Sequence, residues 1–221
     1  MSQDHEVNWI GTITHGRYLV DPGKTPKDAP LLVGFHGYGE NAERHLEKLQ
    51  QIPGVDDWLV CAVGALHPFY NTKTGEVIDS WMTSRGREQA IEDNLAYVAR
   101  VVARVQRQYD TSRRLVFAGF SQGVAMAYRA AAQAGSACHG LIALAGDVPP
   151  DVAQREPDLP PILLGRGTKD QWYSEGKMES DLATLARLGV EPETCVFKGG
   201  HDWTPDFWRH CGEFLAARLV V

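Results

Sequence analysis

Short apolar runs recur along the chain and are separated by segments with helical spacing. The runs are nearly continuous and do not alternate apolar with polar residues, which is typical of strands buried on both faces of a sheet. Parallel sheets covered by helices contain strands of this kind. We predict strands at Leu31–Phe35, Trp58–Val63, Leu115–Ala118, Leu141–Ala145, Ile162–Leu164 and Thr194–Phe197, preceded by a strand or hairpin at Thr12–Val20.

Between these runs, apolar residues step by three and four positions, as they do on one face of an α-helix. Two such series are evident, and Gly189 follows the second at a place where glycine commonly ends a helix. Residues 124–134 and 206–219 predict two further helices. The two series are Ile91, Leu95, Val98, Val102 and Val105, and Met178, Leu182, Leu185 and Leu188.

Strands that alternate with helices favour right-handed crossovers, and therefore the α/β class with a mostly parallel sheet and helices on both faces. A chain of 221 residues fits one domain, so we expect residues 1–221 to fold together, with residues 1–10 as a loose N-terminal tail. The proline-rich segment Asp147–Pro161 is interpreted as an exposed loop within that domain.

Composition and charge narrow the classes of partner. The chain is 43% hydrophobic and 23% charged, which is ordinary for a globular protein, and its formal net charge is −6 with no block of lysine or arginine. Nucleic acid and anionic membrane surfaces reward clustered positive charge, so neither is expected as a partner. No apolar run is long enough for a secretion signal or a membrane span, and we expect a cytoplasmic protein. Four scattered cysteines are interpreted as buried thiols.

The stretch GFSQG, at positions 119–123, stands where a predicted strand passes into a predicted helix. A sharp turn there would bring the two backbones together at Gly119 and Gly123, where larger side chains would collide. Such a turn strains Ser121 and lifts its hydroxyl above the carboxyl edge of the sheet. A phosphate-binding loop is disfavoured because no GxxxxGK[ST] pattern is present. The stretch therefore predicts a nucleophile elbow with Ser121 as the nucleophile.

A serine hydroxyl is a weak nucleophile and needs a general base. His201, in FKGGHDWTP, directly follows the last predicted strand, where a flexible Gly-Gly can aim its side chain at the serine. His139 opens a predicted strand, and His210 lies within the predicted C-terminal helix, so both are disfavoured. We predict that His201 is the base.

The base in turn needs a carboxylate that orients its ring. Asp170, in LLGRGTKDQW, follows the predicted strand Ile162–Leu164 and is the favoured acid. Asp147, in ALAGDVPP, follows the preceding strand and stays open as the alternative. Asp202 adjoins the histidine in sequence and points away too readily to orient it.

A tetrahedral oxyanion needs two N–H donors. The backbone N–H of Gln122 begins the helix after the serine, where negative charge is favoured. The turn His36–Gly39, in LLVGFHGYGEN, follows an early strand and offers the backbone N–H of Tyr38 as the second donor. His36 itself is expected to pack against this loop or to hydrogen-bond with it.

Taken together, HGYGEN, GFSQG, GTKDQW and GGHDW resemble the phospholipase/carboxylesterase family of α/β-hydrolases, which includes the acyl-protein thioesterases. The resemblance extends from about Leu31 to the C-terminal helix. It implies an α/β-hydrolase fold without a large cap domain, Ser121, Asp170 and His201 as a catalytic triad, and Tyr38 and Gln122 at the oxyanion positions. Val124, Gln171–Tyr173 and Ser80–Met82 depart from the family's pattern, so the substrate of any one member is not transferred.

Aromatic and basic residues supply candidates for substrate binding. Trp81, Trp172 and Trp203 flank loops near the predicted active edge, and we expect them to line an acyl pocket, with plain packing as the alternative. Arg85 and Arg87 are interpreted as the solvated start of a helix in preference to a contact with an anionic substrate group.

These features predict a serine esterase that hydrolyses carboxylic esters, and thioesters as a further class, of short to medium acyl chains. The expected partner is a small-molecule acyl ester, and the mechanism requires no cofactor and no metal. A hydrolase-fold binding protein without catalysis and a serine peptidase on the same fold are the alternatives. The natural substrate and the oligomeric state are left open.

Overall fold

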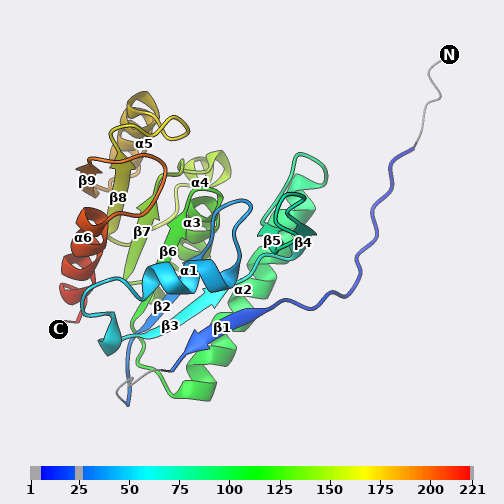
Figure 1. The fold of residues 1–221 in the computed structure, drawn as a ribbon, viewed down its shortest axis with the longest axis horizontal. Helices are drawn as coiled ribbons and strands as arrows, with labels where there is room; N and C mark the ends of the chain where they lie inside the picture. Colours follow the sequence, from blue (N-terminus) through cyan, green and yellow to red (C-terminus); the bar gives the residue numbers. More distant parts are fainter. Residues whose placement is uncertain (1–5, 23–26, 220–221) are drawn as a thin grey trace.

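The computed structural model of the protein describes residues 6–22 and 27–219, and its centre is a seven-stranded sheet (Figure 1). The strand order is β1-β3-β2-β6-β7-β8-β9, in which β1 is antiparallel to β3 and every other neighbouring pair is parallel. The strands are β1 (Tyr18–Asp21), β2 (Leu31–Phe35), β3 (Leu59–Val63), β6 (Leu115–Phe120), β7 (Gly140–Leu144), β8 (Ile162–Gly167) and β9 (Glu193–Phe197).

Helices cover both faces of this sheet (Figure 1). In that view α1 (Ala42–Leu49) and α6 (Pro205–Ala216) lie in front of the sheet, whereas α2 (Arg87–Tyr109) and α3 (Gln122–Ala134) lie behind it. The remaining helices are α4 (Pro150–Arg155), α5 (Glu175–Arg187) and the short 3₁₀ turns η1 (Val55–Asp57) and η2 (Gly135–Ala137). A separate hairpin of β4 (His67–Tyr70) and β5 (Val77–Ser80) precedes α2.

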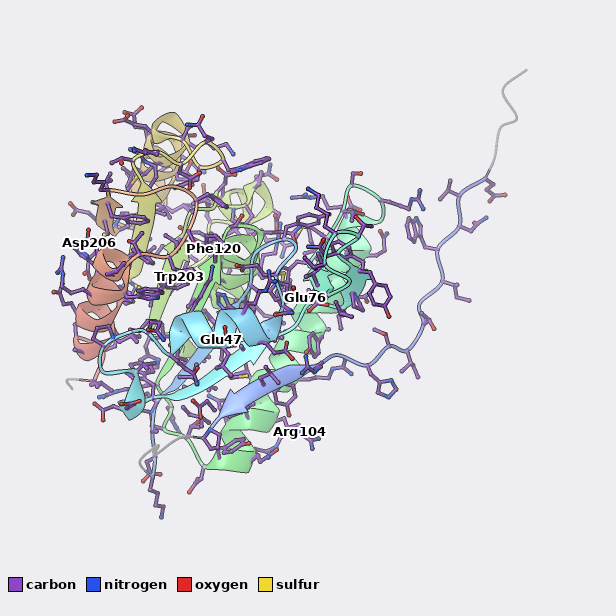
Figure 2. All side chains as sticks on the ribbon, viewed as in Figure 1. Glu47, Glu76, Arg104, Phe120, Trp203 and Asp206 are labelled. Carbon is purple, nitrogen blue, oxygen red and sulfur yellow. The ribbon has the colours of Figure 1, made fainter. Side chains whose placement is uncertain are left out.

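The central strands are buried along their whole length, which is why their sequences are continuously apolar. Every residue of β2, β3, β6, β7 and β8 is buried. The side chains follow the same division: Phe120 and Trp203 point into the interior, whereas the charged Glu47, Arg104 and Asp206 lie on the outside (Figure 2). The predicted α/β-hydrolase architecture, a mostly parallel sheet with helices on both faces, is confirmed.

Apart from Thr12–Val20, the predicted strands and helices are confirmed within a few residues at their ends. Gly189 ends α5 as expected: it takes a left-handed conformation at φ 75°, and its N–H donates to the carbonyl of Ala186 at 3.0 Å. The four cysteines are free and buried, as predicted. Within the described part of the chain, no helix has the length and apolar character needed to cross a bilayer.

The predicted strand or hairpin at Thr12–Val20 needs correction. Of Thr12–Val20, only the part from Tyr18 onward belongs to a strand, because Tyr18 pairs with Val63 and β3 ends there, so earlier residues have no strand to pair with. The expected N-terminal tail, residues 1–10, falls partly outside the described residues. Residues 6–17 carry no regular structure, and within them Trp9 lies against Gly86 and Gly16 against Tyr97.

The proline-rich segment Asp147–Pro161 is not simply an exposed loop. It contains α4, and its apolar residues Val148, Val152 and Leu159 are buried against the core. Pro150 is the first residue of α4, a position that proline tolerates because no intrahelical N–H bond is lost there. Pro149 and Pro150 therefore begin a short helix that contacts α3.

The parallel strands place five connecting segments at one edge of the sheet. Phe35 pairs with Gly119, Phe120 with Leu144, and β8 and β9 end together at Gly167 and Phe197. The segments that follow β2, β6, β7, β8 and β9 consequently leave the sheet at the same edge. In parallel α/β sheets this carboxyl edge is where ligands bind.

Candidate active site

Ser121 stands alone between the last residue of β6 and the first residue of α3. Its backbone has φ 51° and ψ −118°, a conformation that costs a non-glycine residue on the order of 1–3 kcal/mol. Neighbours hold it there: its N–H donates to the Leu144 carbonyl at 2.9 Å, and its own carbonyl accepts from the Val124 N–H at 3.0 Å. The strain and the anchoring match the predicted sharp turn.

The two glycines that flank Ser121 are required by close backbone contacts. A Cβ at Gly119 would lie 2.6 Å from the carbonyl oxygen of Gly123, so the strand and the helix nearly touch. A Cβ at Gly123 would lie 2.0 Å from the carbonyl oxygen of Phe35, at the end of β2. Any side chain at either position would push the elbow away from the sheet.

His201 lies between Ser121 and Asp170. Its Nε2 is 2.8 Å from the Oγ of Ser121, and its Nδ1 is 2.8 Å from the Oδ2 of Asp170. The His201 ring also packs on Phe120, with 5.1 Å between ring centroids. The three residues predicted as nucleophile, base and acid thus form one continuous hydrogen-bonded chain.

Asp170 is held by the loop on which it stands. Its carboxylate is fully buried, and its Oδ1 accepts hydrogen bonds from the N–H groups of Trp172 at 2.8 Å and Tyr173 at 2.9 Å. This loop also touches the histidine loop, because the N–H of Lys169 donates to the Gly199 carbonyl at 2.8 Å. The other carboxylate oxygen therefore faces the His201 ring in a fixed direction.

Asp147, the alternative acid, has a different partner. Its Oδ2 is 3.1 Å from the Nζ of Lys177, and both side chains are about half exposed. No hydrogen bond joins Asp147 to His201 among the residues that the structure describes. The geometry thus favours Asp170 over Asp147 as the group that orients the histidine.

The turn after β2 leaves one backbone donor free. The N–H groups on either side of Tyr38 are used, by the carboxylate of Glu40 for Gly37 at 2.8 Å and by the carbonyl of Asp79 for Gly39 at 3.1 Å. The Tyr38 N–H has no acceptor within the described residues, and the same holds for the Gln122 N–H at the start of α3. Both donors predicted for an oxyanion are therefore unengaged.

His36 supports this turn, as expected. It is fully buried, its Nδ1 donates to the Gly37 carbonyl at 2.7 Å, and its Nε2 accepts from the Ala65 N–H at 3.1 Å. Burial lowers the pKa of its imidazole, so the neutral ring that this pattern requires is favoured.

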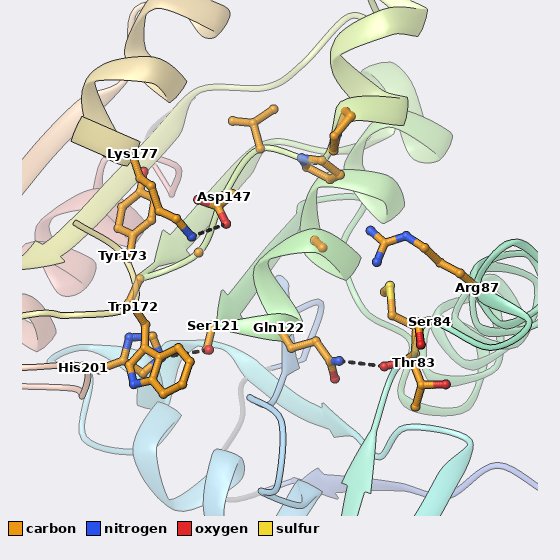
Figure 3. A pocket seen from close by; sticks show the side chains of 17 residues that line it. Thr83, Ser84, Arg87, Ser121, Gln122, Asp147, Trp172, Tyr173, Lys177 and His201 are labelled. Carbon is orange, nitrogen blue, oxygen red and sulfur yellow. Dashed lines mark hydrogen bonds and ion pairs between the residues drawn. The ribbon is translucent and has the colours of Figure 1, made fainter. Parts of the chain in front are cut away.

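A cavity of about 460 Å³ opens above Ser121 (Figure 3). Its wall comes from the segment before α2, the start of α3, and the loops after β7 and β8. Its lining includes Arg87, Asp147, Trp172, Lys177 and His201. The size falls within the range usual for small-molecule sites.

Of the three candidate tryptophans, Trp172 lines this cavity and is 75% exposed. The prediction that Trp81 and Trp203 line it is wrong. Trp81 is fully buried, because its Nε1 donates to the His36 carbonyl at 2.9 Å and its ring packs on Phe35. Trp203 packs between Phe120 and other core rings and is 5% exposed.

One known protein family matches most of the chain. The phospholipase/carboxylesterase family model matches residues 18–219. The chain belongs to this family. The family resemblance predicted from the four sequence stretches is therefore confirmed, and so is the expectation of an enzyme, since these proteins are hydrolases of the carboxylesterase and thioesterase type.

Solved structures share the fold of this phospholipase/carboxylesterase-family protein at low sequence identity. Esterase PE8 superposes with a TM-score of 0.73 at 22% identity, over 92% of this chain and 99% of that one. Acyl-protein thioesterase 2 from Zea mays gives 0.67 at 20% identity, over 93% and 100%. The Bacillus cereus carboxylesterase gives 0.68 at 16%, over 92% and 94%. A search of curated protein sequences finds no significant match.

The side chain of Gln122 has a structural role that the sequence analysis missed. Its Oε1 accepts from the Trp81 N–H at 2.9 Å, and its Nε2 donates to the Met82 carbonyl at 2.9 Å. These two hydrogen bonds connect the segment before α2 to the turn at Ser121. From the sequence alone nothing distinguished this amide from a solvated one.

Arg129 was also missed, although its sequence context carries a signal. It is 3% exposed, on a helix otherwise rich in alanine, and it makes two hydrogen bonds to the carboxylate of Asp151 on α4 at 2.9 and 2.7 Å. A single charge in the middle of an apolar helix implies a buried partner. This pair attaches α4 to α3 beside the cavity.

Asp181 connects the two loops that border the cavity. This buried residue of α5 accepts, through Oδ2, the N–H of Val148 at 3.1 Å and the hydroxyl of Tyr173 at 2.9 Å. Burial raises the pKa of its carboxyl to about 6. Its position between Met178 and Leu185 on the apolar face of α5 was a signal that could have revealed it.

We expect Asp181→Asn to stabilise the protein near neutral pH and to leave its stability near pH 4 almost unchanged. Between the ordinary pKa of 3.8 and about 6, the native state holds a proton that the unfolded chain has released, so rising pH destabilises the wild type. The limiting slope is roughly 1.4 kcal/mol per pH unit. Asparagine keeps an acceptor oxygen without this titration. Urea unfolding followed by circular dichroism across this pH range measures the difference.

Asp151→Asn is the matched control, because the pKa of Asp151 is shifted in the opposite direction to that of Asp181. The ion pair with Arg129 lowers the pKa of Asp151, so its contribution is present above the ordinary pKa and is lost as the pH falls. This variant should be less stable than the wild type near neutral pH. Parallel stability profiles for the wild type and Asp181→Asn would contradict the assignment of a raised pKa to Asp181.

Proposed function

We propose that the protein is a serine esterase that hydrolyses carboxylic esters, thioesters included, of short to medium acyl chains through an acyl-enzyme on Ser121. The observation that carries this proposal is the chain of two 2.8 Å hydrogen bonds from Asp170 through His201 to Ser121 at the wall of the cavity. A serine in a strained turn, with its hydroxyl on an imidazole nitrogen, is the arrangement that nucleophilic catalysis requires.

In the first half of the reaction, His201 acts through Nε2. With Nδ1–H donating to Asp170, Nε2 is the basic nitrogen and takes the Ser121 proton as Oγ attacks the carbonyl carbon. The negative charge that develops on the carbonyl oxygen is stabilised by the N–H groups of Tyr38 and Gln122. Collapse of the tetrahedral intermediate breaks the bond from the carbonyl carbon to the oxygen of the alcohol, or to the sulfur of the thiol. This leaving group departs with the proton from His201.

The second half repeats these steps with water. His201 takes a proton from the water, whose oxygen attacks the acyl carbon, and the oxyanion lies again between the same two donors. Collapse breaks the ester bond to Ser121, and His201 returns its proton to Oγ. The products are a carboxylic acid and an alcohol or thiol, and the enzyme is restored.

The limit to short and medium chains follows from how little covers the site. The segments between β3 and α2, and between β7 and β8, contain a hairpin and the six-residue α4, and the described residues include no helical cap domain above the cavity. In an open cavity each added methylene stays partly in water, so it gains less than the ~0.8 kcal/mol of full burial.

We expect kcat/KM for p-nitrophenyl esters to rise from acetate to a maximum at short or medium chains and to stop rising before palmitate. A fluorophosphonate probe, added before the substrates, should abolish the hydrolysis of all of them. A value of kcat/KM that keeps increasing to palmitate would contradict the chain-length limit. Binding of the esters without turnover would instead support a hydrolase-fold binding protein.

A further inference from the structure

The positive and negative charges of the residues that line the cavity above Ser121 do not cancel. Four lining residues have acidic or basic side chains: Arg87, Asp147, Lys177 and His201. Asp147 and Lys177 form an ion pair with each other at 3.1 Å. His201 is held by Asp170, whose carboxylate is fully buried and also accepts two backbone N–H groups. Arg87 is left as the charge that no neighbour compensates.

Arg87 is aimed at the cavity. It is the first residue of α2, and Figure 3 shows its guanidinium directed towards the cavity from the side opposite His201 and Trp172. No carboxylate lies within ion-pair distance of it in the described part of the chain. Arg87 differs from the other arginines without an ion pair because it lines the cavity. Six arginines pair with an aspartate or glutamate: Arg17, Arg44, Arg129, Arg187, Arg209 and Arg218.

An unpaired arginine in this place affects neutral and anionic ligands differently. The protein as a whole carries a formal charge of −6, so its surface repels anions in general. A long apolar chain that lay across Arg87 would remove water from the guanidinium and replace it with nothing, which costs free energy. A carboxylate there would meet a planar pair of N–H donors whose geometry fits two oxygens.

We propose that Arg87 selects esters that carry a second, anionic group of the carboxylate type, bound at the end of the cavity opposite Trp172. The inference rests on the proposed esterase function and specifies the substrate class of the same site. Because Arg87 and Ser121 line one cavity of about 460 Å³, a short spacer connects the anion to the ester carbonyl. The hydroxyl of Ser84, which also lines this end, is a further donor to the anion, whereas the hydroxyl of Thr83 donates to the Arg85 carbonyl at 3.3 Å.

The anion can stand on the acyl side or on the alcohol side of the ester, and two matched pairs of substrates distinguish these sources. On the acyl side, mono-p-nitrophenyl glutarate is compared with p-nitrophenyl valerate. On the alcohol side, 4-acetoxybenzoate is compared with its methyl ester. In the wild type, kcat/KM should be about five- to tenfold higher for the charged member of one pair, which is the size expected of a charge-assisted contact at an open wall.

Arg87→Gln should bring that ratio close to one, and Arg87→Lys should retain part of it, since lysine keeps the charge and loses the planar fork. Raising the ionic strength should reduce the wild-type ratio. The control is Arg85→Gln, which removes an exposed arginine that does not line this cavity and should retain the full ratio. Thermal unfolding verifies that each variant is folded.

Failure of this inference differs from failure of the esterase proposal. Hydrolysis of the neutral esters with a ratio that Arg87→Gln leaves unchanged would overturn the role of Arg87 and keep the esterase. If no ester is hydrolysed, the proposed function fails, and calorimetric titration with glutarate then decides the role of Arg87. Binding that is weakened in Arg87→Gln and kept in Arg85→Gln supports it, and equal or absent binding overturns it.

Discussion

Ser121→Ala is expected to abolish labelling by a fluorophosphonate probe and to lower kcat for p-nitrophenyl esters by about 10⁶, the loss seen when the nucleophile is removed in a serine protease. The variant keeps the elbow, because alanine occupies the same backbone position without the Oγ on which His201 depends. Without that oxygen no acyl-enzyme can form, and the remaining groups can only polarise the substrate. Intact-mass spectrometry of the labelled protein and steady-state kinetics measure both effects.

Ser112→Ala is the matched control. Ser112 stands before β6, at the end of that strand opposite Ser121, and its Oγ accepts a hydrogen bond from the N–H of Arg114 at 3.3 Å. This variant should be labelled and should hydrolyse esters like the wild type. Undiminished hydrolysis by a folded Ser121→Ala protein would refute the nucleophile assignment.

Asp170→Asn is expected to lower kcat by up to ~10⁴ with little change in folding. Oδ1 of Asp170 accepts the N–H groups of Trp172 and Tyr173, so the amide oxygen of asparagine is required on that side. The amide NH₂ must then face Nδ1 of His201, which makes Nδ1 the acceptor and places the ring proton on Nε2. In that tautomer the imidazole cannot take the Ser121 proton.

Asp147→Asn tests the alternative acid and serves as the control. It removes an ion pair with Lys177 in which both side chains are about half exposed, so a change of less than about 1 kcal/mol in stability is expected and kcat should be retained. Kinetics of both variants against one ester, with circular dichroism for folding, decides between them. A large loss in Asp147→Asn with an active Asp170→Asn would move the acid to Asp147.

The central sheet and the helices of the hydrolase fold could be predicted from the sequence because buried segments have a recognisable pattern of apolar residues. Strands covered on both faces read as continuous apolar runs, and Leu31–Phe35 coincides with β2. The error at Thr12–Val20 shows the limit: whether a residue joins a strand depends on a partner, and β3 ends where Tyr18 pairs. The burial of Val148, Val152 and Leu159 within Asp147–Pro161 likewise could not be predicted, because packing against the core involves residues distant in sequence.

For the site, the sequence by itself determined the elbow. The turn needs small residues at Gly119 and Gly123 and a strand and a helix around Ser121, and all of these lie within a few positions of the serine. It also narrowed the base to His201 and the acid to two aspartates. Only the tertiary structure separated Asp170 from Asp147, through a 2.8 Å contact to His201 for one and an ion pair with Lys177 for the other. It likewise buried Trp81, exposed Trp172 to the cavity, and directed Arg87 towards it. The physical reason is that the local sequence pattern specifies whether a segment forms a strand, a helix or a turn. The direction and partner of a side chain on a loop depend instead on which loops the sheet brings to the same edge.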